Sequence, residues 1–141
     1  MRNLCLLLAS VLLFAFAAEA SVCILPRHME TTPKFARYLY GKTHAIALVR
    51  VISVAETPTS NLSEAQVEIV EVLKGTPVSP LKFHPTRLPS GPRPKVGESR
   101  IFALEDNLVL SCMNSFVDMF PEQELLEELR KLSREKSNDV R

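Results

Sequence analysis

The stretch THAIALVRVISVAE (residues 43–56), followed shortly by AQVEIVEVLKG (residues 65–75), decides the fold. Both segments are dense in isoleucine, valine and leucine, and neither holds a glycine or proline before its last position, which is typical of β-strands. The segment between them, TPTSNLS (residues 57–63), has the composition of a loop. The sequence therefore predicts two long strands, consecutive in the chain, in a mainly β fold.

The second of these segments changes phase part-way along. Its apolar residues alternate at Val67 and Ile69 and then shift by one position to Val70 and Val72. A one-residue shift inside a strand is what a β-bulge produces, and bulges bend strands at the corners of small barrels. We therefore expect this strand to curve.

Three shorter strands are expected further along the chain, in LKFH (residues 81–84), SRIFALE (residues 99–105) and NLVLSC (residues 107–112). The proline-rich segment over residues 85–97 cannot pair regularly and is expected to form a surface loop. Five strands at this spacing, together with helices, predict a mainly β architecture: an OB-fold-like five-stranded β-barrel with a C-terminal α-helix.

Helical patterns flank the strands. PKFARYLY (residues 33–40) predicts a short helical turn that ends at Gly41. PEQELLEELRKLSREK (residues 121–136) predicts a longer helix, because Pro121 suits its first turn and its acidic residues precede its basic ones, as the helix dipole favours. Its apolar stripe either packs on the barrel or offers itself to a groove on a partner. The stripe consists of Leu125, Leu126, Leu129 and Leu132.

The first 20 residues have the pattern of a secretory signal. Arg2 supplies a positive charge, an apolar run follows, and Ala18-Glu19-Ala20 gives the small-x-small pattern that a signal peptidase cleaves. The run is shorter than the roughly 20 apolar residues of a membrane-spanning helix, and an uncleaved N-terminal anchor is the alternative. We expect a secreted or periplasmic protein with no transmembrane span after signal removal. The expected division is a signal peptide over residues 1–20, a barrel domain over 21–120, and a C-terminal amphipathic helix and tail over 121–141.

Composition argues against several kinds of partner and chemistry. The chain has 17 Lys+Arg against 16 Asp+Glu, 6% aromatic residues and no tryptophan. Nucleic-acid-binding barrels gather aromatic and basic residues on one sheet face, so no nucleic-acid partner is expected. His28, His44 and His84 lack the spacing of metal ligands, and no nucleophile with an adjacent base is recognisable. We therefore expect no metal, no other cofactor and no enzymatic activity.

The cysteine count bears on both the fold and the compartment. Cys5 lies in the predicted signal, so the mature chain keeps Cys23 and Cys112. Two cysteines in an oxidising compartment favour a disulfide, and closing a loop of this length contributes roughly 4 to 5 kcal/mol in the chain-entropy model. The alternative is a reactive free thiol, which needs a basic neighbourhood, whereas Cys112 follows an apolar run. One Cys23–Cys112 disulfide is expected.

Three segments, taken in order, resemble the netrin-module and tissue-inhibitor-of-metalloproteinases (NTR/TIMP-like) superfamily. They are VEIVEVLKG (residues 67–75), VGESRIFAL (residues 96–104) and NLVLSC (residues 107–112). They match a strand that ends in a Lys-Gly turn, a Gly-Glu before a strand reading Phe-Ala, and a cysteine after the next strand. The resemblance covers residues 21–117 and implies an OB-like barrel with the N-terminus stapled against it.

The resemblance also implies a way of binding. In the inhibitors of this superfamily the mature chain begins Cys-x-Cys. The third residue pairs with a distant cysteine, and the first lays its amine and carbonyl on the zinc of a metalloproteinase. Cleavage after residue 20 of this chain gives Ser21-Val22-Cys23, so Cys23 takes the third position and Ser21 replaces the first cysteine. The amine and carbonyl of Ser21 can still bind zinc, but the second staple is missing.

We therefore predict a monomeric, exported, protein-binding module that acts through the N-terminal edge, defined as Ser21, Val22, Cys23 and Ile24, with Cys112 as its anchor. Inhibition of a zinc metalloproteinase is one hypothesis for its function. The alternative is a non-inhibitory structural or oligosaccharide- or ligand-binding OB-type domain of the cell envelope. The two differ in one test, because adding a residue before Ser21 weakens an inhibitor and leaves the other kind of module unchanged.

Overall fold

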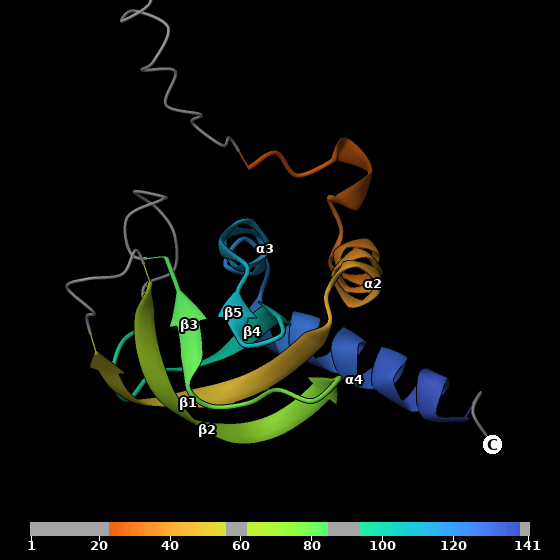
Figure 1. Cartoon of the computed structure of the whole chain (residues 1–141). Coiled ribbons are helices and arrows are strands. Elements are labelled where there is room, and N and C mark those ends of the chain that lie inside the picture. The colour runs from red at the N-terminus through yellow and green to blue at the C-terminus, as the bar shows by residue number, and fades with distance from the viewer. Residues whose placement is uncertain (1–22, 56–61, 85–93, 139–141) are drawn as a thin grey trace, which may run out of the picture.

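The structure, a computed structural model, describes residues 23–55, 62–84 and 94–138 (Figure 1). The predicted signal peptide, Ser21, Val22 and most of the proline-rich segment lie outside these residues. The described strands form a closed barrel in the order β1-β2-β3-β5-β4. Neighbouring strands are antiparallel except β3 and β5, which are parallel. The strands are β1 (Ala45–Ala55), β2 (Ser63–Lys74), β3 (Leu81–Phe83), β4 (Ser99–Glu105) and β5 (Leu108–Val109). The predicted OB-fold-like five-stranded barrel is confirmed.

Helices precede and follow the barrel. They are the 3₁₀ turn η2 (Arg27–Met29) and the α-helices α2 (Thr32–Lys42), α3 (Ser111–Val117) and α4 (Glu122–Asn138). The C-terminal helix is confirmed. The strand expected over residues 107–112 is wrong in its second half, because β5 ends at Val109 and Ser111 already begins α3.

Helix α2 is a full helix rather than a short turn, and Gly41 lies inside it instead of ending it. Thr43 ends the helix, since its hydroxyl donates a hydrogen bond to Leu39 O (2.8 Å) and its N–H donates to the same oxygen (3.2 Å). The Lys74 ammonium, at the end of β2, donates to Tyr40 O and Thr43 O, both at 2.5 Å. A cation on the last carbonyls of a helix is favoured by the helix dipole, so β2 helps to hold α2 in place.

The predicted bulge in β2 is present. Glu71 pairs with Leu48 and Ile69 pairs with Val49, which leaves Val70 as the extra residue. Val70 and Val72 are nevertheless 48% and 50% exposed, so the shift in the apolar pattern does not follow burial. The bulge instead gives β2 the curvature that closure of a small barrel requires.

Gly75, directly after β2, explains the Lys-Gly turn in physical terms. Its φ is +66°, and a Cβ at this position would lie 2.3 Å from the backbone oxygen of His44. An L-residue at positive φ is disfavoured, and here it would also collide with backbone that cannot rotate away. The end of β2 therefore passes the start of β1 at a distance that only glycine allows.

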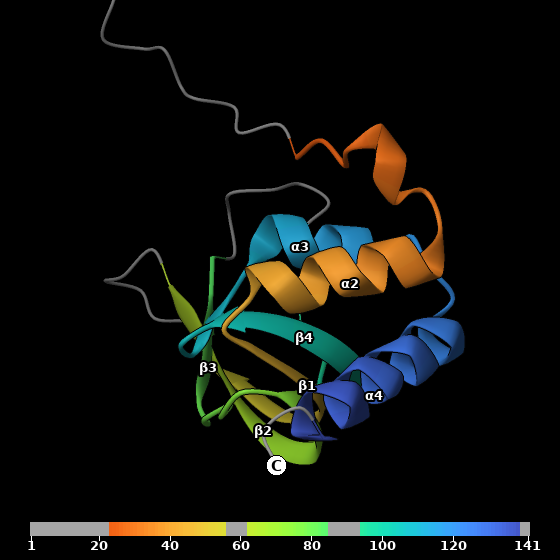
Figure 2. The same cartoon turned by 90° about the vertical axis from the view of Figure 1, so that its right-hand side faces the viewer.

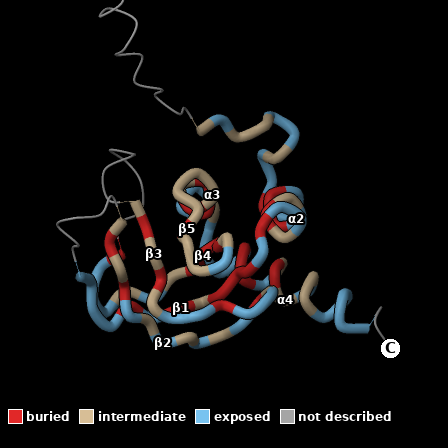
Figure 3. Tube along the Cα trace, in the orientation of Figure 1, coloured by how far each residue is buried: buried red, intermediate tan, exposed pale blue. Residues whose placement is uncertain are grey.

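The core has two parts, and Figure 3 colours the buried residues red. Inside the barrel lie Val49, Leu81, Phe102 and Leu104 with their neighbours. Between the barrel and the helices lie side chains from α2, α3, α4 and three strands, among them Phe35, Leu39, Ile46 and Leu73. The leucine stripe of α4 belongs to the second part, with Leu125, Leu126 and Leu129 buried. The interpretation that this stripe packs on the barrel is therefore confirmed.

A charged pair also fixes α4 to the barrel. The Arg130 guanidinium donates three hydrogen bonds of 2.7 to 3.1 Å to the Glu71 carboxylate on β2. These hydrogen bonds, with the positive charge of Arg130, hold the pKa of Glu71 below its ordinary value although partial burial opposes this. The same contacts raise the pKa of Arg130.

Candidate functional site: the N-terminal edge and its anchor

The N-terminal edge begins, in the described residues, at a disulfide. Cys23 and Cys112 are bonded, with their Cα atoms 5.3 Å apart, which confirms the predicted pairing. Cys23 and Leu25 pack against the core between barrel and helices, whereas Ile24 between them is 76% exposed. Alternate side chains of this extended segment thus lie on the core and in solvent. The backbone at Ile24 is therefore held on one side by the Cys23–Cys112 disulfide and on the other by the packing of Leu25.

Helix α3, which carries Cys112, is itself fixed to the barrel by Asn114. The side chain of Asn114 is fully buried, and its Oδ1 accepts a hydrogen bond from the Ala103 N–H (3.1 Å). Its Nδ2 donates to Ala103 O (3.0 Å) and to Leu110 O (2.8 Å). The amide therefore continues the β4–β5 ladder where β5 ends, and it joins the anchor of the N-terminal edge to the central sheet.

Aromatic contacts join α2 to the chain that follows α3. The ring of Phe35 stacks on Phe120 with centroids 4.5 Å apart, and Phe116 meets the same ring edge-on at 6.5 Å. Such pairs add to the stabilisation from burial alone. Figures 1 and 2 show α2 and α3 on the same side of the barrel, close to the N-terminal segment. The N-terminal edge therefore rests on a packed platform.

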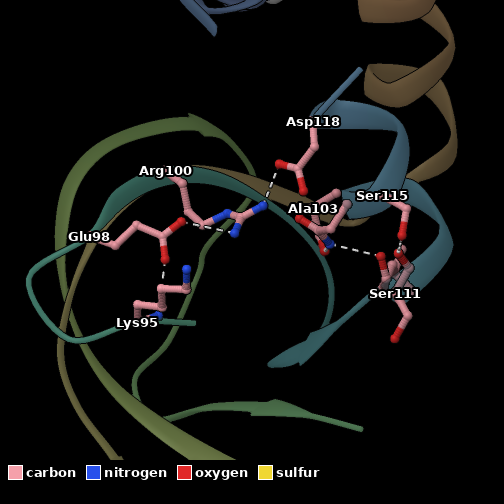
Figure 4. Close-up of polar contacts among 9 residues, drawn as sticks. Lys95, Glu98, Arg100, Ala103, Ser111, Ser115 and Asp118 are labelled. Atoms are coloured by element: carbon pink, nitrogen blue, oxygen red, sulfur yellow. Dashed lines mark hydrogen bonds and ion pairs between the residues drawn. The ribbon is translucent and has the colours of Figure 1, made fainter. Parts of the chain in front are cut away.

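Arg100 on β4 supports the end of α3, as Figure 4 shows. Its guanidinium donates to Asp118, the residue after α3, and to Glu98 Oε1 at 2.9 Å. The same group lies over the ring of Phe102, 5.4 Å from its centroid. The Arg100 side chain is only 11% exposed, whereas its partners Glu98 and Asp118 are 29% and 49% exposed, so the guanidinium is buried beneath carboxylates that face solvent. Helix α3 is thus held at its middle by the side chain of Asn114 and at its C-terminal end by Arg100.

The charged side chains of the described residues do not form a metal site. His44 lies with its Nε2 3.2 Å from Glu105 and its Nδ1 3.8 Å from Asp106, all largely exposed. Within the described ranges, no group of three His, Cys, Asp or Glu side chains is arranged to hold a metal ion. Over the same residues, no helix has the length and apolar composition needed to cross a membrane.

Of the residues predicted for the site, the structure brings Cys23, Ile24 and Cys112 together. Asn114 and Arg100 hold the site in place, and neither was predicted from the sequence. Their contacts span 18 or fewer residues, but they join elements whose packing no local pattern reports.

Comparisons with protein-family models, with curated proteins and with solved structures found no match for this chain.

Proposed function

We propose that this chain is an exported, disulfide-stapled protein-binding module that binds its partner through the N-terminal edge. The observation that carries the proposal is Ile24, a branched apolar side chain that is 76% exposed on backbone anchored by the neighbouring disulfide. Backbone that is already ordered loses little conformational entropy on association, so the contact energy of Ile24 goes largely into affinity. A partner with an apolar pocket fits this arrangement.

The partner class that we propose is a zinc metalloproteinase. Cleavage after Ala20 creates a free amine at Ser21, two residues before the disulfide. An unperturbed α-amine has a pKa of about 8, so part of it is neutral at pH 7 and able to bind zinc together with the Ser21 carbonyl. The inhibitors of the NTR/TIMP-like superfamily, which the sequence resembles, carry a second cysteine at this position. Without it, Ser21 loses more freedom on binding, and we expect weaker inhibition than two staples would give.

The experiment compares three proteins with a panel of zinc metalloproteinase catalytic domains and a fluorogenic peptide substrate. The first protein begins at Ser21, the second carries one added alanine before Ser21, and the third carries one alanine after Arg141. The proposal predicts that the first and third inhibit equally and that the second is weaker by at least about tenfold, because its amine is displaced from the zinc.

Equal inhibition by all three proteins would show that the free amine takes no part. No inhibition of any enzyme by the protein that begins at Ser21 would remove the metalloproteinase proposal and favour the non-inhibitory alternative. Mass spectrometry of each protein before the assay establishes the N-terminal residue and the intact disulfide, so that neither failure has a trivial cause.

A further inference from the structure

The charges of the chain are unevenly distributed. The whole chain carries a net charge of +1, but residues 23–42 hold four Lys and Arg residues and a single carboxylate, Glu30. The four cations, which we name the basic face, are Arg27, Lys34, Arg37 and Lys42, and all are exposed. This segment directly follows the N-terminal edge.

The basic face is not used for internal contacts among the described residues. Three other arginines are paired there: Arg50 with Glu68, Arg100 with Glu98 and Asp118, and Arg130 with Glu71. None of the described carboxylates forms an ion pair with a cation of the basic face. Within the part of the chain that the structure describes, these four charges therefore face solvent and are open to a partner.

The geometry of α2 sets two of these cations on one surface. Phe35, Ala36 and Leu39 are buried on the inner side of the helix, and Lys34 and Arg37, three positions apart, are exposed on the outer side. Arg27 adds an exposed cation between Ile24 and α2, because η2 begins three residues after Ile24 and its backbone lies close to that of α2. A partner that covers Ile24 would meet these charges at the rim of its contact.

We infer that the partner of the N-terminal edge carries an acidic protein surface beside the pocket that receives Ile24, and that the basic face steers it into place. This inference rests on the proposed function. A long sulfated or phosphorylated polymer fits less well, since α4 packs beside α2 and exposes Glu122, Glu124 and Glu127, which repel a continuous polyanion. A protein surface can match four cations and avoid these carboxylates.

The test uses a metalloproteinase catalytic domain whose cleft rim is rich in carboxylates, together with its variant in which the rim Asp and Glu are replaced by Asn and Gln. Association and dissociation rates are measured by surface plasmon resonance for wild type, Lys34→Gln/Arg37→Gln and the control Lys131→Gln/Arg134→Gln. The control removes two exposed cations of α4 that are not part of the basic face. Circular dichroism checks that each exposed substitution leaves the fold intact.

We expect the Lys34→Gln/Arg37→Gln variant to bind the acidic domain about three to ten times more slowly in about 0.05 M salt, with a smaller change in dissociation rate. The difference between the two association rates should nearly vanish in about 0.5 M salt, because the screening length is then short and the electrostatic attraction is weak. It should also nearly vanish with the neutralised domain. The control should match wild type throughout.

Equal association rates for the two double variants, with binding still abolished by Ile24→Asp, would overturn this inference and leave the proposed function standing. Binding that ignores Ile24→Asp, or no binding by wild type, would overturn the proposed function and this inference with it. If Lys34→Gln/Arg37→Gln weakens binding to dextran sulfate and leaves the protease rates unchanged, the basic face is a polyanion site and the inference is wrong.

Discussion

Replacing Asn114 by alanine should uncouple α3, and with it the anchor of the N-terminal edge, from the barrel. Val51 N–H donates to Glu98 O (2.9 Å), and the antiparallel register set by this bond turns the Ala103 N–H away from β1 and toward Asn114. Alanine at position 114 leaves that buried N–H without its acceptor. The carbonyls of Ala103 and Leu110 each keep one hydrogen bond from a backbone donor. Ala103 O still accepts from Leu110 N–H (3.0 Å), and Leu110 O still accepts from the N–H of residue 114 (2.9 Å).

The cost follows from this difference. An orphaned buried N–H costs about 1 to 3 kcal/mol, and each of the other two lost hydrogen bonds costs about 1 kcal/mol. We therefore expect Asn114→Ala to lower the free energy of unfolding by about 3 to 5 kcal/mol, a large part of the roughly 5 to 15 kcal/mol that is typical of a domain. Asn114→Asp should be at least as harmful, since a carboxylate faces two carbonyl oxygens instead of donating to them.

Urea unfolding, followed by far-ultraviolet circular dichroism, measures this loss. Ser115→Ala is the matched control on the same helix, because its hydroxyl donates only to Ser111 O within one helical turn (3.0 Å). The control should stay within about 0.5 kcal/mol of wild type. An Asn114→Ala protein that unfolds within about 1 kcal/mol of wild type would refute the role of the amide as the link between α3 and β4.

Three other contacts of the fold can be tested through stability. Gly75→Ala should lower the free energy of unfolding in urea by more than about 2 kcal/mol, because position 75 has a positive φ and the new Cβ would lie 2.3 Å from the backbone oxygen of His44. An unchanged urea midpoint would contradict this close approach of the two backbones. Because of the Glu71–Arg130 contact, the melting temperature of wild type should be higher than that of Glu71→Gln at pH 7. Because the folded-state pKa of Glu71 is lowered, this advantage should disappear as the pH falls from 4.5 through that lowered pKa, and an advantage that persists in strong acid would argue against it. Cys23→Ser/Cys112→Ser should lower the free energy of unfolding by roughly 4 kcal/mol and speed hydrogen exchange first in the N-terminal segment, whereas uniform exchange would show that the disulfide is not a local anchor.

The strands, the C-terminal helix and the disulfide could be predicted because their signals are local or can be counted. Apolar density marks β1 and β2, the leucine stripe marks α4, and the two cysteines outside the predicted signal leave one pairing. Helix α3 could not be predicted in this way. Its seven residues, SCMNSFV, include two serines and an asparagine, which are weak helix formers, and it is fixed by long-range hydrogen bonds of Asn114.

The candidate site was predictable in part for the same reason. The sequence places Ile24 next to a cysteine, but its exposure depends on how Cys23 and Leu25 pack against helices far along the chain. The exposed surface formed by Lys34 and Arg37 likewise emerges only when the buried side of α2 is known. The net charge of the whole chain gives no sign of this basic surface, whereas the net charge of residues 23–42 alone would have indicated it.

The inhibition constant of Ile24→Asp tests the central claim most directly, with Val78→Asp as the control. Val78 is an exposed apolar residue, 49% exposed, in the segment between β2 and β3, away from the disulfide. A charge placed in the apolar pocket of the partner should raise the inhibition constant toward a metalloproteinase catalytic domain by at least about thirtyfold, as expected for an interface hot spot, while Val78→Asp stays within about twofold. Equal inhibition constants for Ile24→Asp and Val78→Asp would contradict binding through the N-terminal edge.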